Sequence, residues 1–237
     1  MAVIHAHFDR EQVFNLARAR NYLCHRQAHH ALRSFLRRSF SRPLHLLDLG
    51  CGDAREIAAT LRNLPVAHYT GVDTSSPKLT RARQHLSRLA CPCNLVAADA
   101  LEYLRHSREP VDVIWMGLFL HHFSRPLKRE LFGLARQILR PGGCLLAHDP
   151  LPREDESRQD YLRRLAGVCR RQWVALSPAD RRSLYRHWSR HGRHERFSVL
   201  SRMAQQAGFC QGSLLFRDNQ ELYALTLFPL PSAPSLP

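Results

Sequence analysis

LHLLDLGCGDA, at residues 44–54, is the stretch of sequence that decides the fold. Its first six residues are mostly apolar and are bounded by a proline and a glycine, which is typical of a buried β-strand. The glycines at 50 and 52 allow a tight turn and let the backbone come close to a ligand. A helical pattern over 53–63 follows, with Asp53 as the candidate N-cap. These residues therefore predict a strand, a ligand-binding turn and a helix.

The same pattern repeats along the chain: short apolar runs alternate with amphipathic stretches. Such alternation predicts right-handed βαβ crossovers and a parallel sheet with helices on both faces. Pro141-Gly142-Gly143 is expected to end a helix and to start the next strand. The predicted strands are 44–49, 68–72, 94–97, 111–116 and 144–148, and the predicted helices between them are 53–63, 76–89, 99–106 and 124–139.

Helical and hairpin patterns flank this alternating region. Two apolar runs around Asp218-Asn219-Gln220 predict an antiparallel hairpin, and the Pro/Ser-rich end of the chain predicts disorder. The predicted parts of one domain, 1–237, are N-terminal helices at 8–40, a ligand-binding core at 44–150, a helical lid insertion at 151–194, a last helix with a closing hairpin at 195–228, and a disordered tail at 229–237.

Two carboxylates follow the second and third predicted strands. Asp73 comes 21 residues after Gly52, and Asp99 ends the next strand unit. An acid at the first of these places can accept hydrogen bonds from ribose hydroxyls. Because parallel strands end at one edge of a sheet, both carboxylates are expected near the glycine turn.

In these motifs the chain resembles the class I S-adenosylmethionine (SAM)-dependent methyltransferases, over 44–150 and 195–228. The resemblance implies a doubly wound, Rossmann-like α/β fold with a seven-stranded, mostly parallel sheet and a C-terminal antiparallel hairpin. Ala54 stands where that family often has a third glycine. A dinucleotide-binding reading fits less well, because Arg55 takes the place of its third glycine.

The resemblance also implies the cofactor SAM, with S-adenosylhomocysteine as product. Asp73 matches the family's ribose-binding acid, and Asp99 its adenine-contacting acid. The residues that the resemblance places around the cofactor are Asp48, Gly50, Cys51, Gly52, Asp73, Thr74, Asp99, Ala100, Met116 and Gly117.

The loop after the fourth strand narrows the class of methyl acceptor. It reads Met116-Gly117-Leu118-Phe119, without the Asn/Asp-Pro-Pro-aromatic motif of nucleobase amino-methyltransferases or a Pro-Cys nucleophile. The Lys-Asp-Lys-Glu set of ribose methyltransferases and the paired carboxylates of catechol-type enzymes have no match either. A small-molecule acceptor and no metal are therefore predicted.

Residues after strands four and five are the candidates for acting on the acceptor, because histidine accepts protons near neutral pH. The catalytic candidates are His122, His148 and Asp149, with capping or packing as their alternative role. His121, Glu156, Arg158 and Tyr161 are the candidates for binding the substrate, and a solvated charged helix is the alternative for the last three.

The charge balance leaves the partner open. Lys and Arg total 35 against 20 Asp and Glu, a net charge of +15. An Arg-lined pocket for an anionic small molecule would use this excess. An RNA- or protein-directed methyltransferase, or a non-catalytic SAM-binding regulator, would use it as well. Nucleic acid is not favoured, since aromatic residues are only 8% and no stacking motif is present.

The remaining features point to an ordinary intracellular chain. No run approaches the roughly 18 apolar residues of a membrane span, and the start is unlike a secretory signal. The expected location is the cytoplasm, where the seven cysteines would be reduced. No feature of the sequence indicates an oligomeric state.

Overall fold

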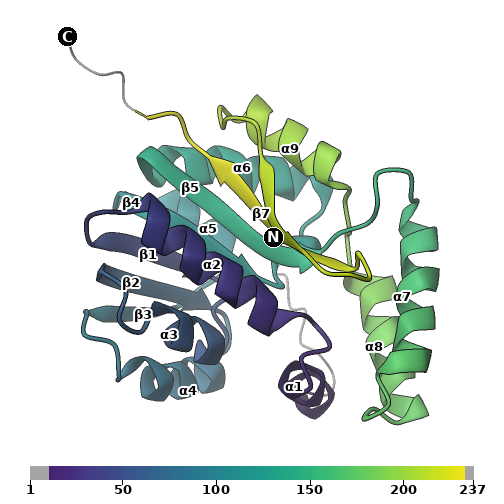
Figure 1. The fold of residues 1–237 in the computed structure, drawn as a ribbon. Helices are drawn as coiled ribbons and strands as arrows, with labels where there is room; N and C mark the ends of the chain where they lie inside the picture. Colours follow the sequence, from purple (N-terminus) through teal and green to yellow (C-terminus); the bar gives the residue numbers. More distant parts are fainter. Residues whose placement is uncertain (1–10, 233–237) are drawn as a thin grey trace.

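The computed structural model describes residues 11–232 of the chain. A seven-stranded sheet with the order β3-β2-β1-β4-β5-β7-β6 runs through its centre, as Figure 1 shows. The first five strands are parallel, and β7 is antiparallel to both β5 and β6. The predicted Rossmann-like sheet with a closing antiparallel hairpin is therefore confirmed.

The helices and strands follow the predicted order. The strands are β1 (Leu44–Leu49), β2 (Val66–Asp73), β3 (Cys93–Ala97), β4 (Val111–Gly117), β5 (Leu139–Pro150), β6 (Ser213–Arg217) and β7 (Tyr223–Pro229). The helices are α1 (Glu11–Ala19), α2 (His25–Ser39), α3 (Arg55–Leu61), α4 (Ser76–Leu86), α5 (Ala100–His106), the 3-10 turn η1 (Leu120–His122), α6 (Arg125–Ile138), α7 (Arg158–Gln172), α8 (Pro178–His191) and α9 (Phe197–Gln206).

Each face of the sheet has its own apolar core. On one face α2, α3 and α4 pack through residues such as Leu32, Ile57 and Ala82. On the other, α5, α6 and α9 pack through residues such as Leu104 and Phe132. Because β1 to β5 are parallel, their carboxyl ends lie together at one end of the sheet, where folds of this type bind ligands.

A third apolar cluster lies next to the carboxyl ends of the parallel strands. It joins α1, α7 and α8 to the start of β7, with Val13, Leu165, Trp173, Trp188 and Tyr223 all buried in it. In Figure 1, α7 and α8 lie beside the same end of the sheet as α1. Helix α8 begins as a capping box, with Ser177 at the N-cap and Pro178 in the first turn.

Two local predictions differ from the structure. Asp53 is not the N-cap of α3; Ala54 takes that place with φ 52°, and the Asp53 carboxylate pairs with Arg18 instead. Strand β5 begins at Leu139, so the Pro-Gly-Gly segment lies within the strand, where the pairing with β4 shifts register, and not in a turn before it. The N-terminal helices are α1 and α2 in the described residues, and they are separated near Cys24, which has φ 56°.

Of the predicted disordered tail, residues 233–237 lie outside the part of the chain that the structure describes. Residues 229–232 continue the packed structure: Leu230 is buried and its amide donates to the carbonyl of Gly143 at 2.8 Å. Among helices of the described part, none is long and apolar enough to cross a membrane.

Candidate functional site

A pocket of about 420 Å³ opens at the carboxyl ends of β1, β2 and β4. This volume lies in the range of small-molecule and cofactor sites. The glycine turn at 50–52 forms one side of it, α1 and α2 cover it, and α8 and the start of β7 contribute the far side. Segments distant in sequence thus meet at one site.

The glycine turn is tied to the neighbouring strand through its backbone. The amides of Gly50 and Cys51 both donate to the carbonyl of Val72, at 2.8 and 3.0 Å. Gly50 has φ +72°, and a Cβ built on it would lie 2.5 Å from the ring of Phe119. Gly52 has φ +56°, and a Cβ there would meet nothing within 4 Å. The turn therefore needs glycine at 50 for conformation and space, and it presents open space at 52.

Asp73 borders the pocket with acceptor capacity to spare. One carboxylate oxygen accepts from the amide of Gly52 at 2.9 Å and the other from the amide of Ser75 at 2.8 Å. A carboxylate has about four acceptor positions, so two remain for a ligand. Below the turn, buried Asp48 accepts from the hydroxyl of Tyr69 at 2.8 Å, and burial raises the pKa of Asp48 to about 7.

The structure brings most of the predicted cofactor residues to this pocket. Asp99 is elsewhere: its side chain caps α5 by accepting from the amides of Leu101 and Glu102, at 2.9 and 3.2 Å. Ala100 and Met116 are buried and do not border the pocket. The predicted cofactor residues that do border it are Asp48, Gly50, Cys51, Gly52, Asp73, Thr74 and Gly117.

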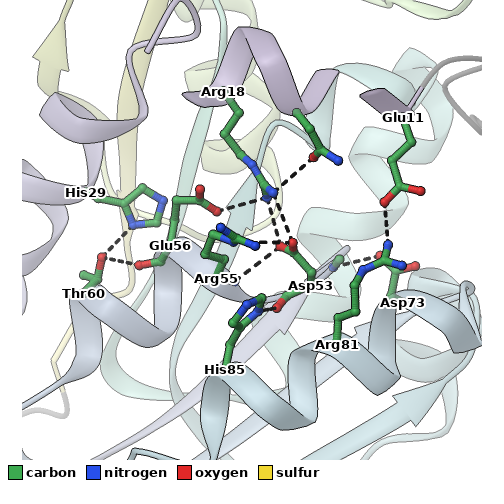
Figure 2. A network of polar contacts seen from close by, with 12 residues as sticks. Glu11, Arg18, His29, Asp53, Arg55, Glu56, Thr60, Asp73, Arg81 and His85 are labelled. Carbon is green, nitrogen blue, oxygen red and sulfur yellow. Dashed lines mark hydrogen bonds and ion pairs between the residues drawn. The ribbon is translucent and has the colours of Figure 1, made fainter. Parts of the chain in front are cut away.

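Helix α1 is attached over the glycine turn by ion pairs, which Figure 2 shows from close by. Arg18 donates to both oxygens of Asp53, at 2.9 and 3.1 Å, and to Glu56 at 3.2 Å. Glu11 accepts from Arg81 of α4 in the same region. No local sequence pattern predicts these contacts, because the paired residues are 35 to 70 positions apart.

The predicted acceptor-side residues form a buried hydrogen-bonded pair. His121 borders the pocket, and its Nδ1 lies 2.6 Å from Oδ1 of Asp149, which is behind it. Burial raises the pKa of the Asp149 carboxyl, and the positive charge of Lys128 opposes this. Lys128 is itself buried, donates to the carbonyls of Phe123 and Arg193, and has its pKa lowered to about 8 by burial. Burial lowers the pKa of His121 to about 3.

Other histidines border the pocket or lie behind its wall. His122 also borders the pocket, and burial lowers its pKa well below the usual value. His25 and His29, both from α2, border it too, and burial lowers their pKa values to about 3 and 4. His148 is completely buried behind His25, at a ring distance of 5.5 Å, and does not border the pocket. The sequence offered no signal for the two α2 histidines.

The predicted substrate residues of the insertion do not reach the pocket. Arg158 donates to the carbonyls of Gly192 and Ser189, at 3.0 and 2.7 Å. Glu156 pairs with Arg164 at 2.6 Å, and the hydroxyl of Tyr161 donates to Leu222 at 3.0 Å. These contacts hold α7 against α8 and the start of β7. The structure therefore gives Glu156, Arg158 and Tyr161 a structural role in place of the predicted contact with substrate.

Comparison with known proteins adds independent findings. The sequence model of a methyltransferase domain family matches residues 46–143. The carboxy-S-adenosyl-L-methionine synthase of Aeromonas salmonicida (strain A449) is 37% identical over 124 residues, 49% of this chain and 48% of that protein. The trans-aconitate 2-methyltransferase of Methylobacterium nodulans is 31% identical over 125 residues, 53% of this chain and 45% of that protein. The chain spans about half the length of the curated relatives it matches.

A solved structure extends the likeness of fold to nearly the whole chain. The plantazolicin methyltransferase BpumL in complex with SAH aligns with a TM-score of 0.66, over 94% of this chain and 90% of that one. Sequence identity in that alignment is 14%, so it bears on the fold alone.

Proposed function

We propose, from the premise that this chain belongs to the class I SAM-dependent methyltransferases, that it transfers a methyl group from SAM to a small molecule and releases S-adenosylhomocysteine. One observation carries the proposal. The glycine turn with Asp73 and the His121–Asp149 pair border or back one continuous pocket. A cofactor held at one side can therefore meet an acceptor held at the other.

The residues present fit SAM in shape and charge. The open space at Gly52 admits a ligand close to the backbone, and Asp73 has free acceptor positions for ribose hydroxyls. Acidic side chains and the indole of Trp115 border the pocket, and both suit a positively charged sulfonium. Asp99 is occupied as a helix cap, so we propose no cofactor contact for it.

SAM supplies an electrophilic methyl group, and the chain has to orient the acceptor and manage its proton. We propose His121 as the group that accepts this proton. Burial raises the pKa of Asp149 and the charge of Lys128 opposes this, and we propose that Asp149 is ionised during turnover. The Nδ1–H of His121 then donates to Asp149 and leaves Nε2 as an acceptor. Asp149 is thus a positioning residue that fixes the tautomer of the imidazole.

The cofactor assignment is tested by Asp73→Asn. We expect the affinity for SAM to fall at least about tenfold, because hydrogen bonds to a charged acceptor contribute roughly 1.5–3 kcal/mol each. Calorimetric titration with SAM measures this. Asp99→Asn is the matched control, since asparagine also caps helices and we propose no cofactor contact there. Unchanged affinity in the Asp73 variant, or an equal loss in both variants, would contradict the assignment.

A small-molecule acceptor is proposed over RNA or protein, because the pocket, which α1 and α8 border, has a volume of about 420 Å³, the size of a small-molecule site. A screen of metabolite extracts for transfer of labelled methyl from SAM, with and without RNase treatment, separates the two. Label that enters a low-mass product and survives RNase supports the proposal. Label that is lost with RNase or recovered only in protein would replace it with the alternative acceptor.

A further inference from the structure

One wall of the pocket is built from aromatic rings that take no part in the proposed proton transfer. We call it the aromatic wall, formed by His25, His29, Trp115 and Tyr223. His29 lies against Trp115 with ring centroids 5.3 Å apart, and His25 and His29 are stacked at 6.4 Å. Buried His148 lies behind the wall, 5.5 Å from His25 and 6.1 Å from Tyr223. Flat, polarisable surfaces of this kind bind planar ligands well.

Two polar groups of the aromatic wall have no partner among the residues that the structure describes. They are Nδ1 of His25 and the hydroxyl of Tyr223. Both side chains border the pocket, and they are only 9% and 1% exposed. Buried polar atoms are nearly always hydrogen-bonded. A polar group in the pocket would supply the missing partner when either side chain turns slightly toward it.

The charges around the pocket disfavour an anionic ligand at this wall. Three cationic side chains border the pocket in the described part of the chain, Arg18, Lys78 and Arg81, and they come from α1 and α4 beside the glycine turn. Arg18 and Arg81 are already paired with acids. Burial keeps His25 and His29 uncharged at neutral pH, with pKa values of about 3 and 4. An anion at the aromatic wall would lose its hydration without gaining a counter-ion.

We propose that the aromatic wall binds a neutral aromatic compound that carries a hydroxyl group, and that this is the class of small molecule the chain methylates. A hydroxyl both donates and accepts, so it can satisfy an imidazole nitrogen and a tyrosine hydroxyl. The choice of acceptor rests on the proposed methyl transfer, whereas the binding of the ring and hydroxyl stands on the wall alone.

Three probes of one size test the proposal in the wild-type protein at pH 7.5. They are 2-naphthol, which is neutral and has the hydroxyl, 2-naphthoate, which is anionic, and 2-methylnaphthalene, which lacks a polar group. Calorimetric or NMR titration is expected to show at least tenfold tighter binding of 2-naphthol than of 2-naphthoate. Equal or tighter binding of the carboxylate, or no binding of 2-naphthol, overturns the proposal.

The variant Tyr223→Phe places the binding at the wall. Removing one hydroxyl partner should weaken 2-naphthol about fivefold and leave 2-methylnaphthalene unchanged. Tyr185→Phe is the matched control, because Tyr185 is exposed and does not border the pocket. If Tyr223→Phe does not alter the preference for 2-naphthol over 2-methylnaphthalene, the wall is not the binding site.

A SAM titration of the same preparations separates this proposal from the proposed function. Binding of 2-naphthol without binding of SAM leaves the aromatic wall as a ligand site and refutes the methyl transfer. Binding of SAM without binding of 2-naphthol leaves the proposed function standing and refutes the aromatic wall as the site of a neutral hydroxylated ring. Transfer of labelled methyl to 2-naphthol would support both.

Discussion

Lowering the pH from 8 to 5 is expected to unfold this protein, because it buries neutral histidines that the unfolded chain would protonate. Burial lowers the pKa of each of these histidines below the usual 6.5: His25, His29, His121, His122, His148 and His194. Below pH 6.5 the unfolded state therefore binds more protons than the folded state. Stability is lost as the pH falls through this value.

Two buried carboxyl groups oppose this loss in part. Burial raises the pKa of Asp48 and Asp149, so the folded state binds protons there at a pH where the unfolded chain does not. Six histidines minus two carboxyls leave a net difference of four protons. At about 1.4 kcal/mol per proton and pH unit, the stability would fall by roughly 5 kcal/mol per pH unit below pH 6. A domain is usually stable by about 5–15 kcal/mol, so the transition is expected between pH 5 and 6.

Circular dichroism from pH 8 to 4 measures the acid transition, and single variants identify its cause. His194→Gln removes one buried titrating group, whose two ring nitrogens have no partner among the described residues, and should move the midpoint to lower pH. His30→Gln, on the exposed face of α2, should leave it in place. Full folding retained at pH 4.5 would show that the histidines are hydrated or paired in solution.

Replacing His121 or Asp149 is expected to give the largest loss of activity. His121→Gln removes the proposed proton acceptor, and general-base help is typically worth about 10²–10⁴ in rate. Asp149→Asn should cost a similar factor, because an amide donor would force the proton of the imidazole onto Nε2. Turnover is measured with labelled SAM and the acceptor that the extract screen or the naphthol assay identifies. The affinity for SAM, measured by calorimetry, should stay within about threefold of the wild type.

His122→Gln is the matched control, since His122 borders the same pocket and has no carboxylate partner in the described structure. It should keep most of the turnover. A larger loss from the His122 variant than from the His121 variant would transfer the role of base to His122.

Local sequence was enough to determine the fold and the side of the pocket that the glycine turn and Asp73 form. The alternation of strands and helices, the turn at Gly50 and Gly52, and Asp73 at the end of the next strand are all encoded within short stretches. Because parallel strands end at one edge of a sheet, their neighbours in sequence become neighbours in space there. The local N-cap pattern was wrong for Asp53, whose carboxylate pairs with Arg18 rather than capping its own helix.

Only the tertiary structure decided the other side of the pocket, where the proposed acceptor would bind. His121 and Asp149 are 28 residues apart and pair because η1 and β5 meet at the pocket. His25 and His29 enter it because α2 packs against the sheet from the N-terminal segment. Arg158 looked available for a substrate and is instead occupied by backbone carbonyls of the segment after α8 and its last turn. The sequence determines the chemical type of each side chain, but its burial, charge state and partners depend on which distant segments pack around it.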